Sequence, residues 1–465
     1  MATPTAAELR RTGRHPRVPF AIPLGEDTRI TVTRVLRVLP GKRIVGEGEL
    51  NGQQVLVKLF IAKTGFRHLR RELAGIQALQ RGALPTPGLH PASPAVTPAG
   101  HLLLTEFLAG SEPLDVAPGD DPDRQLQRFE LAFALLGRLH RAGLTHSDLH
   151  PGNLLRHKDT LYILDGDAVK PPPRGRALDT GKAIDNLATL LEMAPGGEER
   201  LLAAYRNTNP GFAPNPRQLR RALHNKRTHS HHRYMKKVVR DSTQLAVNRH
   251  FRRLTIALRS QLQALAEVLS NPDAALQRGQ PLKTGGSSTV VRSDSDAGPL
   301  VIKRYNLKGP GHAFLRLWQP SRALISWQAG FLLRSIGVNT PEPLAMIEER
   351  LGALRRRAWL ICRHCPGVPL AEQLRGDREP SPQEAAALER LFTTLHREQI
   401  SHGDLKASNI YWHDGQLFLL DLDATVRRRF AFTHARAWHR DRARLLRNWP
   451  SDSPLHRWLD RHLPR

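Results

Sequence analysis

The sequence has little cysteine, no long apolar segment and few acidic side chains. Only Cys362 and Cys365 occur among 465 residues, which excludes a disulfide framework and indicates a reducing compartment. No apolar run approaches the roughly 18–20 residues that span a bilayer. The opening "MATPTAAELRRTGRHPR" lacks the apolar core of a signal peptide. We therefore expect a cytoplasmic protein.

The shortage of acid leaves a strongly basic chain, with 70 Lys and Arg against 43 Asp and Glu and a net charge of +27. Residues 217–259 hold thirteen Lys or Arg and one acid, and residues 426–465 interleave arginines with Trp438, Trp449 and Trp458. Such faces suit an anionic membrane surface, where each cation contributes about 1 kcal/mol. We expect peripheral association with the inner membrane, although solvated helices of an arginine-rich protein are an equal alternative for either stretch. Nucleic acid is disfavoured as a partner, because no RRM, KH or zinc-finger pattern accompanies the charge.

The chain repeats one short pattern. "THSDLHPGNLL" begins at Thr145 and "SHGDLKASNIY" at Ser401. In both copies an Asp is followed after five positions by an Asn and after twelve more by an Asp, and the residues are Asp148, Asn153 and Asp165, then Asp404, Asn409 and Asp421. A further aspartate follows twenty positions later in each, Asp185 and Asp441. A period near 256 residues is domain-sized, so we expect two similar domains.

These spacings are those of the catalytic loop of protein-kinase-like phosphotransferases. Asp148 and Asp404 are the predicted catalytic residues, which orient the proton of an attacking hydroxyl. Asn153 and Asp165, and likewise Asn409 and Asp421, are predicted to hold Mg²⁺ against the phosphates of ATP. One copy would be a weak signal, but two copies with equal spacing favour this interpretation over structural Asx turns.

The first half also contains a predicted nucleotide site. "QQVLVKLF" alternates as a strand and offers Lys58, and "FRHLRRELAGIQALQ" has helical periodicity and offers Glu72. An ion pair between them would aim the ammonium group at the α and β phosphates. "HLLLTEFLAG" places Glu106 where a hinge backbone would meet adenine.

The second half offers Lys303 in "GPLVIKRY", after a phosphate loop at Gly285 and Gly286. Alignment of the two halves places Ser326 opposite Glu72, so the helix carboxylate is missing. Cys362 and Cys365 occupy the positions of Thr105 and Leu108. A zinc site there would need a second ligand pair, and strand or hinge packing is the favoured interpretation.

The second half resembles the lipopolysaccharide core kinases, which phosphorylate heptose or Kdo sugars and have a protein-kinase-like fold. The resemblance rests on "SRALISWQAGFLLRSIGVNTPEPLAMIEER", "AWLICRHCPGVPL", "SHGDLKASNIYW" and "LFLLDLDAT" and covers nearly all of residues 277–450. Residues 30–190 look like a more distant relative, similar to atypical kinases around "HSDLHPGNLL". The resemblance implies ATP, Mg²⁺ and an acceptor hydroxyl on the lipopolysaccharide inner core, at the cytoplasmic membrane face.

We therefore predict an α+β protein of two tandem protein-kinase-like bilobal domains. Residues 1–29 form an extension, residues 30–270 the first domain with a basic helical extension, and residues 271–465 the second domain. The stretch "FRRLTIALRSQLQALAEVLSNP" is predicted to be an amphipathic helix that ends at Asn271-Pro272, which puts the boundary near residues 269–276.

Two classes of function remain open. The favoured one is an ATP-dependent kinase acting on lipopolysaccharide core or another anionic glycolipid. The alternative is a pair of catalytically silent domains that binds a core-assembly enzyme. A kinase of proteins or of another small molecule would share every catalytic residue and differ only in its acceptor pocket.

Overall fold

The computed structural model describes residues 2–114, 121–172, 178–285, 288–306, 319–352 and 354–465. The chain has mixed α+β structure and divides into two compact units, Met1–Arg227 (unit 1) and Thr228–Arg465 (unit 2). Each unit contains a large sheet followed by a mainly helical part. Within the described residues, no helix combines the length and apolar character required to cross a membrane.

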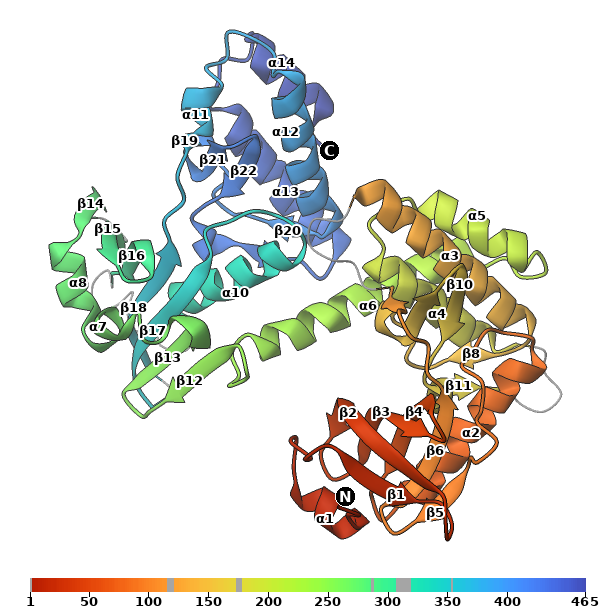
Figure 1. Ribbon diagram of the computed structural model, residues 1–465. Helices are drawn as coiled ribbons and strands as arrows, with labels where there is room; N and C mark the ends of the chain where they lie inside the picture. The colour runs from red at the N-terminus through yellow and green to blue at the C-terminus, as the bar shows by residue number, and fades with distance from the viewer. Residues whose placement is uncertain (1, 115–120, 173–177, 286–287, 307–318, 353) are drawn as a thin grey trace. The chain divides into compact units, whose positions relative to one another are not determined.

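Unit 1 begins with the short helix α1 (Ala6–Arg11) and a six-stranded antiparallel sheet (Figure 1). The spatial order is β1 (Phe20–Pro23), β2 (Arg29–Leu39), β3 (Arg43–Leu50), β4 (Gln53–Phe60), β6 (Gly100–Glu106) and β5 (Ala95–Thr97). Alternating residues of β4 are buried, Val55, Val57 and Leu59, as expected for a strand with one face on a core. Helix α2 (Gly65–Arg81) covers the other face, where Leu69 and Ile76 pack against Phe60 and Leu103.

The second part of unit 1 has a separate core. Four helices enclose it: α3 (Pro122–Arg141), α4 (Thr180–Met193), α5 (Glu198–Thr208) and the start of α6 (Pro216–Lys237). Two small sheets pair β10 (Thr160–Ile163), β9 (Leu154–His157) and β7 (Glu112–Pro113), and β11 (Val169–Lys170) with β8 (Thr145–His146). The 3₁₀ turns η1 (Pro151–Asn153) and η2 (Gly166–Ala168) join these strands to the loops that carry the predicted site residues.

Unit 2 repeats this plan. Its antiparallel sheet has the order β12 (Leu245–Arg249), β13 (Arg253–Leu258), β17 (Pro343–Leu351), β18 (Leu354–Arg363), β16 (Gly298–Tyr305), β15 (Ser288–Ser295) and β14 (Gln280–Lys283). Helix α10 (Arg322–Ser335) packs on one face through Trp327. The turn η3 (Arg259–Gln261) and the helices α7 (Ala266–Ser270) and α8 (Pro272–Arg278) lie between β13 and β14, and Val268 and Leu276 pack with Trp359 in a second core.

The helical part of unit 2 comprises α11 (Leu370–Gln373), α12 (Pro382–Arg397), α13 (Ala431–Leu446) and α14 (Pro454–His462). It contains a sheet of β19 (Val368–Pro369), β21 (Ile410–His413) and β22 (Gln416–Leu419), and the pair β20 (Ile400–Ser401) and β23 (Val426–Arg427). The turns η4 (Ala407–Asn409) and η5 (Leu422–Ala424) match η1 and η2 of unit 1. Asp165 and Asp421, directly before η2 and η5, share the left-handed conformation with φ of 62° and 59°, which is uncommon outside glycine.

The structure corrects the predicted helix between the halves. Residues 253–258, "RLTIAL", form β13, and Leu254 and Ile256 are buried where this strand pairs with β17. Their alternation fits a strand, whereas the helical pattern holds only for the following residues. Because β12 and β13 belong to the sheet of unit 2, the compact units divide at residues 227 and 228, not near residues 269–276.

Candidate active sites

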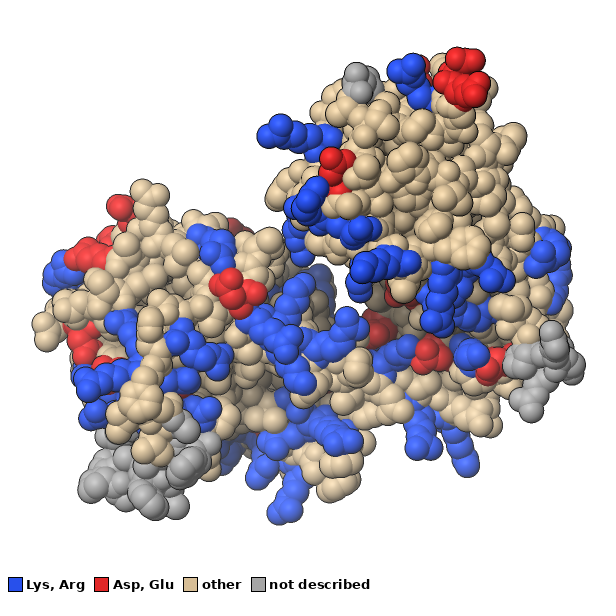
Figure 2. Space-filling model, turned by 90° about the horizontal axis from the view of Figure 1, so that it is seen from below, with Lys and Arg blue, Asp and Glu red and all other residues tan. Residues whose placement is uncertain are grey.

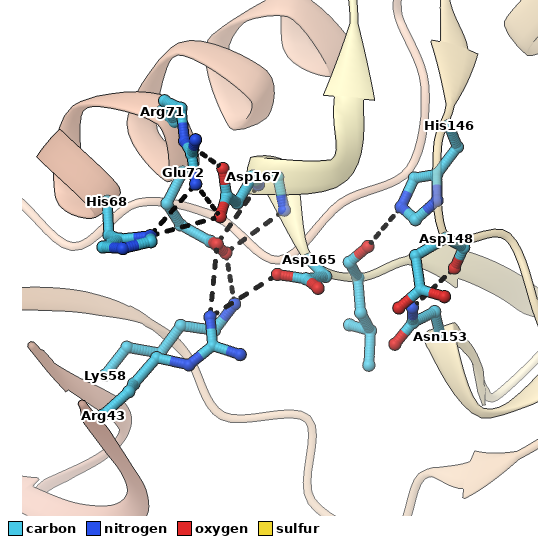
Figure 3. A network of polar contacts seen from close by, with 12 residues as sticks. Arg43, Lys58, His68, Arg71, Glu72, His146, Asp148, Asn153, Asp165 and Asp167 are labelled. Carbon is cyan, nitrogen blue, oxygen red and sulfur yellow. Dashed lines mark hydrogen bonds and ion pairs between the residues drawn. The ribbon is translucent and has the colours of Figure 1, made fainter. Parts of the chain in front are cut away.

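The predicted ion pair of unit 1 is present. Lys58 on β4 donates to Oε1 of Glu72 on α2, and the carboxylate of Glu72 is fully buried (Figure 3). The backbone N–H groups of Gly166 and Asp167 each donate to one oxygen of this carboxylate at 3.2 Å. Glu72 therefore ties the large sheet, helix α2 and turn η2 together at one point.

The local charges keep this buried carboxylate ionised. Burial alone would raise the pKa of Glu72, but the Lys58 ammonium and the Arg43 guanidinium outweigh burial and lower it to about 2. Close packing requires small residues here, because a Cβ atom on Gly75 would lie 1.9 Å from the carbonyl oxygen of Gly166. Helix α2 can thus approach η2 only through glycine.

Asp165 also lies where the sheet, α2 and η2 meet, but its surroundings affect its pKa in the opposite direction to that of Glu72. Nζ of Lys58 contacts Glu72, and the guanidinium of Arg43 lies 3.6 Å from Oδ1 of Asp165. Burial, reinforced by the neighbouring Glu72 carboxylate, raises the pKa of Asp165. The next aspartate, Asp167, pairs instead with Arg71 at 2.6 Å.

Asn153 connects Asp148 to this junction. Its Nδ2 donates to the backbone oxygen of Asp148 at 2.8 Å, and the side chain of Asp148 is two-thirds exposed. Figure 3 shows Asp148 and Asn153 on one side of Asp165, with Lys58 and Arg43 on the other. The structure thus brings the five predicted residues of the first half together.

The loop that follows His146 in unit 1 is anchored by Asn186, the neighbour of the repeated aspartate Asp185. Asn186 accepts from the N–H of His146 at 3.0 Å and donates to its carbonyl oxygen at 2.6 Å. Asp185 is half-exposed and pairs with Lys226 of α6 at 2.7 Å. One residue of offset on a helix turns a side chain by 100°, so Asn186 faces the loop while Asp185 points to α6.

A cavity of about 430 Å³ lies beside these groups in unit 1. Lys58, Glu72, Asn153 and Asp165 line it, and Thr105, Glu106, Phe107 and Leu108 line it from the end of β6. Glu106, the predicted hinge residue, thus borders the cavity, and its backbone N–H donates to the carbonyl oxygen of Gly88 at 2.8 Å. The volume is within the usual range of small-molecule sites.

In unit 2 the strand lysine has another partner. Lys303 on β16 donates to Oδ1 of Asp421 and lies 3.6 Å from Oδ2 of Asp423. Burial would raise the pKa of Asp421, but the Lys303 ammonium outweighs burial and lowers it. Arg322 of α10 pairs with Asp423, as Arg71 of α2 pairs with Asp167.

The predicted loss of the helix carboxylate has a structural counterpart. Ser326 is buried on α10 and its hydroxyl shares a 2.9 Å hydrogen bond with the hydroxyl of Tyr305. The ring centroid of Tyr305 lies 5.0 Å from Nζ of Lys303. A neutral, aromatic contact thus occupies the side of the lysine where unit 1 has Glu72.

Asp404 is held by two cations. Arg444 of α13 donates to one of its carboxylate oxygens, and Lys406 lies 3.2 Å from the other. Burial opposes ionisation, but these two partners prevail and the pKa of Asp404 is lowered. Nδ2 of Asn409 donates to the backbone oxygen of Asp404 at 2.9 Å.

Asp441, the repeated aspartate of the second half, holds the corresponding loop of unit 2. It is buried and accepts from the backbone N–H groups of His402 at 2.7 Å and Gly403 at 3.0 Å. The repeated aspartate therefore holds this loop in unit 2, whereas in unit 1 the residue after it does so.

Unit 2 has a cavity of about 460 Å³ with corresponding walls. Lys303, Ser326, Asn409 and Asp421 line it, together with Cys362 and Cys365. Burial raises the pKa of Cys362 to about 12 and that of Cys365 to about 11, so both thiols are neutral wall residues. Gly285 follows β14 with φ of +83°, and Gly286 lies outside the described residues.

The donor groups in both units fit Mg²⁺. In each unit the amide nitrogen of the asparagine is used by the backbone of the catalytic loop, which leaves its Oδ1 as a ligand. Oδ1 of Asp165 is buried and accepts no hydrogen bond from the described residues. Amide and carboxylate oxygens are the ligands that Mg²⁺ uses alongside nucleotide phosphates.

Comparison with known proteins identifies the second half. Residues 319–458 match the lipopolysaccharide kinase (Kdo/WaaP) family. The 3-deoxy-D-manno-octulosonic acid kinase of Stenotrophomonas maltophilia (strain R551-3) is 31% identical over 40% of this chain and 75% of that protein. The chain belongs to the Kdo/WaaP lipopolysaccharide kinase family. The corresponding kinase of Xylella fastidiosa (strain M12) is 30% identical over 37% of this chain and 70% of its own length.

A solved structure, described as WaaP in complex with acyl carrier protein, aligns over 42% of this chain and 82% of its own. The identity is 22% and the TM-score is 0.29. The Kdo/WaaP match contains Asp404, Asn409 and Asp421, and it begins after Lys303 and after all of unit 1. Sequence reasoning missed Arg43, Arg322, Asp423 and Arg444, whose partners lie far along the chain.

Proposed function

We propose that unit 2 transfers a phosphoryl group from ATP to a sugar hydroxyl of the lipopolysaccharide inner core, at the cytoplasmic face of the inner membrane. Homology to Kdo kinases indicates kinase activity on a core sugar. One observation carries the proposal. Lys303, Asn409 and Asp421 line a single cavity, and Asp404 is hydrogen-bonded to Asn409 at its edge.

Each of these residues has a role in that reaction. Lys303 would hold nucleotide phosphates, and Asn409 and Asp421 would hold Mg²⁺, which neutralises charge on the transferred group. Asp404 would orient the acceptor hydroxyl and accept its proton. Arg444 keeps Asp404 ionised and restricts its rotamer, so the carboxylate is available as an acceptor. Most of the rate gain in phosphoryl transfer comes from such positioning and charge stabilisation.

Unit 1 is proposed to be a second, related kinase-like unit. The support is the matching order of elements and the equivalent cavity, which is lined by Lys58, Glu72, Asn153 and Asp165. Asp148 would orient the acceptor there. The lysine–glutamate pair fixes the ammonium group at the cavity wall before any nucleotide binds. The tandem arrangement would allow two phosphorylations by one chain.

The surface charge supports an anionic partner. The net charge is +27, and Lys and Arg outnumber acidic residues on the face drawn in Figure 2. A lipopolysaccharide core, other anionic glycolipids and an anionic inner-membrane surface all meet this requirement. Of the two basic stretches, 217–259 carries most of its cations on α6, whose buried apolar residues are Leu219 and Leu223.

A second candidate function has one specific observation in its favour. Ser326 replaces the helix carboxylate, and Lys303 pairs with Asp421, the residue needed for metal. A silent unit 2 that binds a core-assembly enzyme or regulates unit 1 would tolerate this arrangement. Transfer to a protein substrate would leave the cavity unchanged and alter only the acceptor.

The experiment is a transfer assay with the full chain. Purified protein, radiolabelled ATP and MgCl₂ are incubated with Kdo-containing lipid acceptor, and the product is analysed by mass spectrometry. We expect one added phosphate on the sugar, loss of the product with EDTA, and loss of unit 2 transfer with Asp404→Asn. Asp414→Asn, an exposed aspartate of unit 2, is the control. ATP binding without any phosphorylated lipid would favour the silent alternative.

A further inference from the structure

The short segment from the end of η5 to the first turn of α13 exposes an unusual amount of apolar surface. Val426, Phe430 and Phe432 are 40%, 53% and 74% exposed. The rings of Phe430 and Phe432 stack with centroids 5.8 Å apart and an interplanar angle of 20°. Exposed aromatic residues are normal when they are single, but a contiguous group marks an interaction site.

The segment is also basic. Arg427, Arg428 and Arg429 precede the aromatic pair, and no acidic residue occurs from Ala424 to Arg440. Arg427 pairs with Glu398 at 3.4 Å, so Arg429 is the cation next to the rings. The guanidinium of Arg429 lies 5.5 Å from the centroid of Phe430. Cations next to exposed aromatic rings suit the interface of an anionic bilayer, where the rings sit among the headgroups and the charges meet phosphate.

The segment is fixed beside the catalytic loop. β23 pairs with β20, and the loop of His402 and Asp404 follows β20 directly. Nε of Arg428 donates to the hydroxyl of Ser401 at 3.1 Å. Phe430 is two residues beyond this anchor, and α13, which begins after it, carries Arg444 to the carboxylate of Asp404.

We infer that residues 426–432 dock unit 2 onto an anionic membrane surface, with Phe430 and Phe432 inserted among the headgroups. This docking rests on the proposed function and extends it, because it would bring the loop of Asp404 to a hydroxyl on a lipid-anchored sugar. The occupant is the bilayer surface itself. Two stacked, exposed rings with a guanidinium beside them match the headgroup region of an anionic bilayer, which takes up both aromatic rings and cations.

The first test needs neither ATP nor acceptor. Full-length protein is co-sedimented with vesicles of phosphatidylcholine and phosphatidylglycerol, as wild type and as Phe430→Ser/Phe432→Ser. We expect vesicle partitioning to weaken about tenfold or more, since two exposed rings are lost. The matched control is Phe66→Ser/Val96→Ser, which removes apolar side chains that are 52% and 76% exposed in unit 1 and should bind as wild type. Equal binding by Phe430→Ser/Phe432→Ser and wild type would overturn the inference.

The second test separates docking from chemistry. Transfer is measured with acceptor embedded in the same vesicles and with deacylated, water-soluble acceptor. Phe430→Ser/Phe432→Ser should lose transfer to the embedded acceptor and keep transfer to the soluble one. Equal loss with both acceptors would contradict docking, because it would indicate a damaged active site. If wild type phosphorylates neither acceptor, the proposed function fails, while the vesicle measurement still decides the docking.

Discussion

The two units hold the same strand lysine in different ways. In unit 1, Lys58 contacts Glu72, a buried helix carboxylate that also accepts two backbone hydrogen bonds. In unit 2, α10 presents Ser326 and Lys303 turns to Asp421. Because α10 offers Lys303 no carboxylate, this lysine pairs with the nearest acidic side chain, Asp421, which is the predicted metal ligand. Under the proposed function, unit 1 would accept a nucleotide without breaking its lysine contact, whereas unit 2 would have to exchange the contact between Lys303 and Asp421.

The first prediction tests whether both arrangements are active. Asp148→Asn and Asp404→Asn should each reduce phosphoryl transfer by their own unit about 10²–10⁴-fold, because each removes the proton acceptor. Only the double variant should abolish all transfer. The measurement is initial rate of lipid phosphorylation by the full chain, with nucleotide binding as the control for folding. Complete loss in either single variant would mean that one unit only supports the other.

Glu72 and Ser326 should also differ in how much they stabilise their own units. Glu72→Ala leaves the Lys58 ammonium and two backbone donors without their buried acceptor, and should destabilise unit 1 by about 3–5 kcal/mol. Ser326→Ala removes one hydroxyl contact to Tyr305 and should cost unit 2 about 1 kcal/mol. Denaturant-dependent hydrogen exchange of peptides from β4 and β16 measures both in the full chain. Similar losses in the two units would show that Glu72 is not the central contact.

A third prediction concerns acid. His140 of unit 1 is buried, with Nδ1 2.9 Å from the hydroxyl of Tyr205, and burial lowers its pKa from 6.5 to about 4. Protonation of His140 is unfavourable in the folded state and normal in the unfolded state. The contribution of neutral His140 to the free energy of unfolding of unit 1 is therefore complete above about pH 6.5 and is lost as the pH falls towards 4. The loss is about 3 kcal/mol.

His140→Gln should flatten the stability of unit 1 between pH 6.5 and 4, measured by the same hydrogen exchange. Unit 2 is the internal control. Burial, followed by the charges of His396 and Arg428, lowers the pKa of His434 to about 4, so unit 2 should keep its acid sensitivity in this variant. An unchanged slope in unit 1 would show that His140 is not the titrating group.

The sequence predicted the contacts that depend on fixed spacing. The catalytic loop and its aspartates are close along the chain, so Asp148, Asn153 and Asp165 were found together with their counterparts. Lys58 and Glu72 were found from strand and helix periodicity. Asn186 was missed because a helix position differs from its neighbour by rotation, which spacing does not show. Arg444 was missed because its contact with Asp404 depends on how α13 packs.

The strands β12 and β13 illustrate another limit. Residues 253–258 alternate in burial, but this alternating pattern is only six residues long. The residues after it favour a helix, so the longer helical pattern determined the prediction. Pairing with β17, about ninety residues away, decides the structure. Non-local pairing of this kind overrides local propensity.

The last prediction is that the charges of the two proposed metal ligands, Asp165 and Asp421, affect stability in opposite directions. Asp165 lies near Glu72, which already satisfies Lys58, and burial with that second carboxylate raises its pKa. Its charge therefore costs stability at neutral pH. Asp421 is the main partner of Lys303, and its pKa is lowered because this ammonium outweighs burial. Its charge contributes stability above its unfolded pKa.

Without nucleotide, Asp165→Asn should leave unit 1 unchanged or stabilise it by about 1 kcal/mol, whereas Asp421→Asn should destabilise unit 2 by about 1–2 kcal/mol. Unfolding monitored separately in each unit measures the difference, and the exposed Asp159→Asn and Asp414→Asn control for the change in net charge. Destabilisation of equal size in both units would mean that Lys58 relies on Asp165 as much as Lys303 relies on Asp421. In that case the missing helix carboxylate would not account for the difference between the two sites.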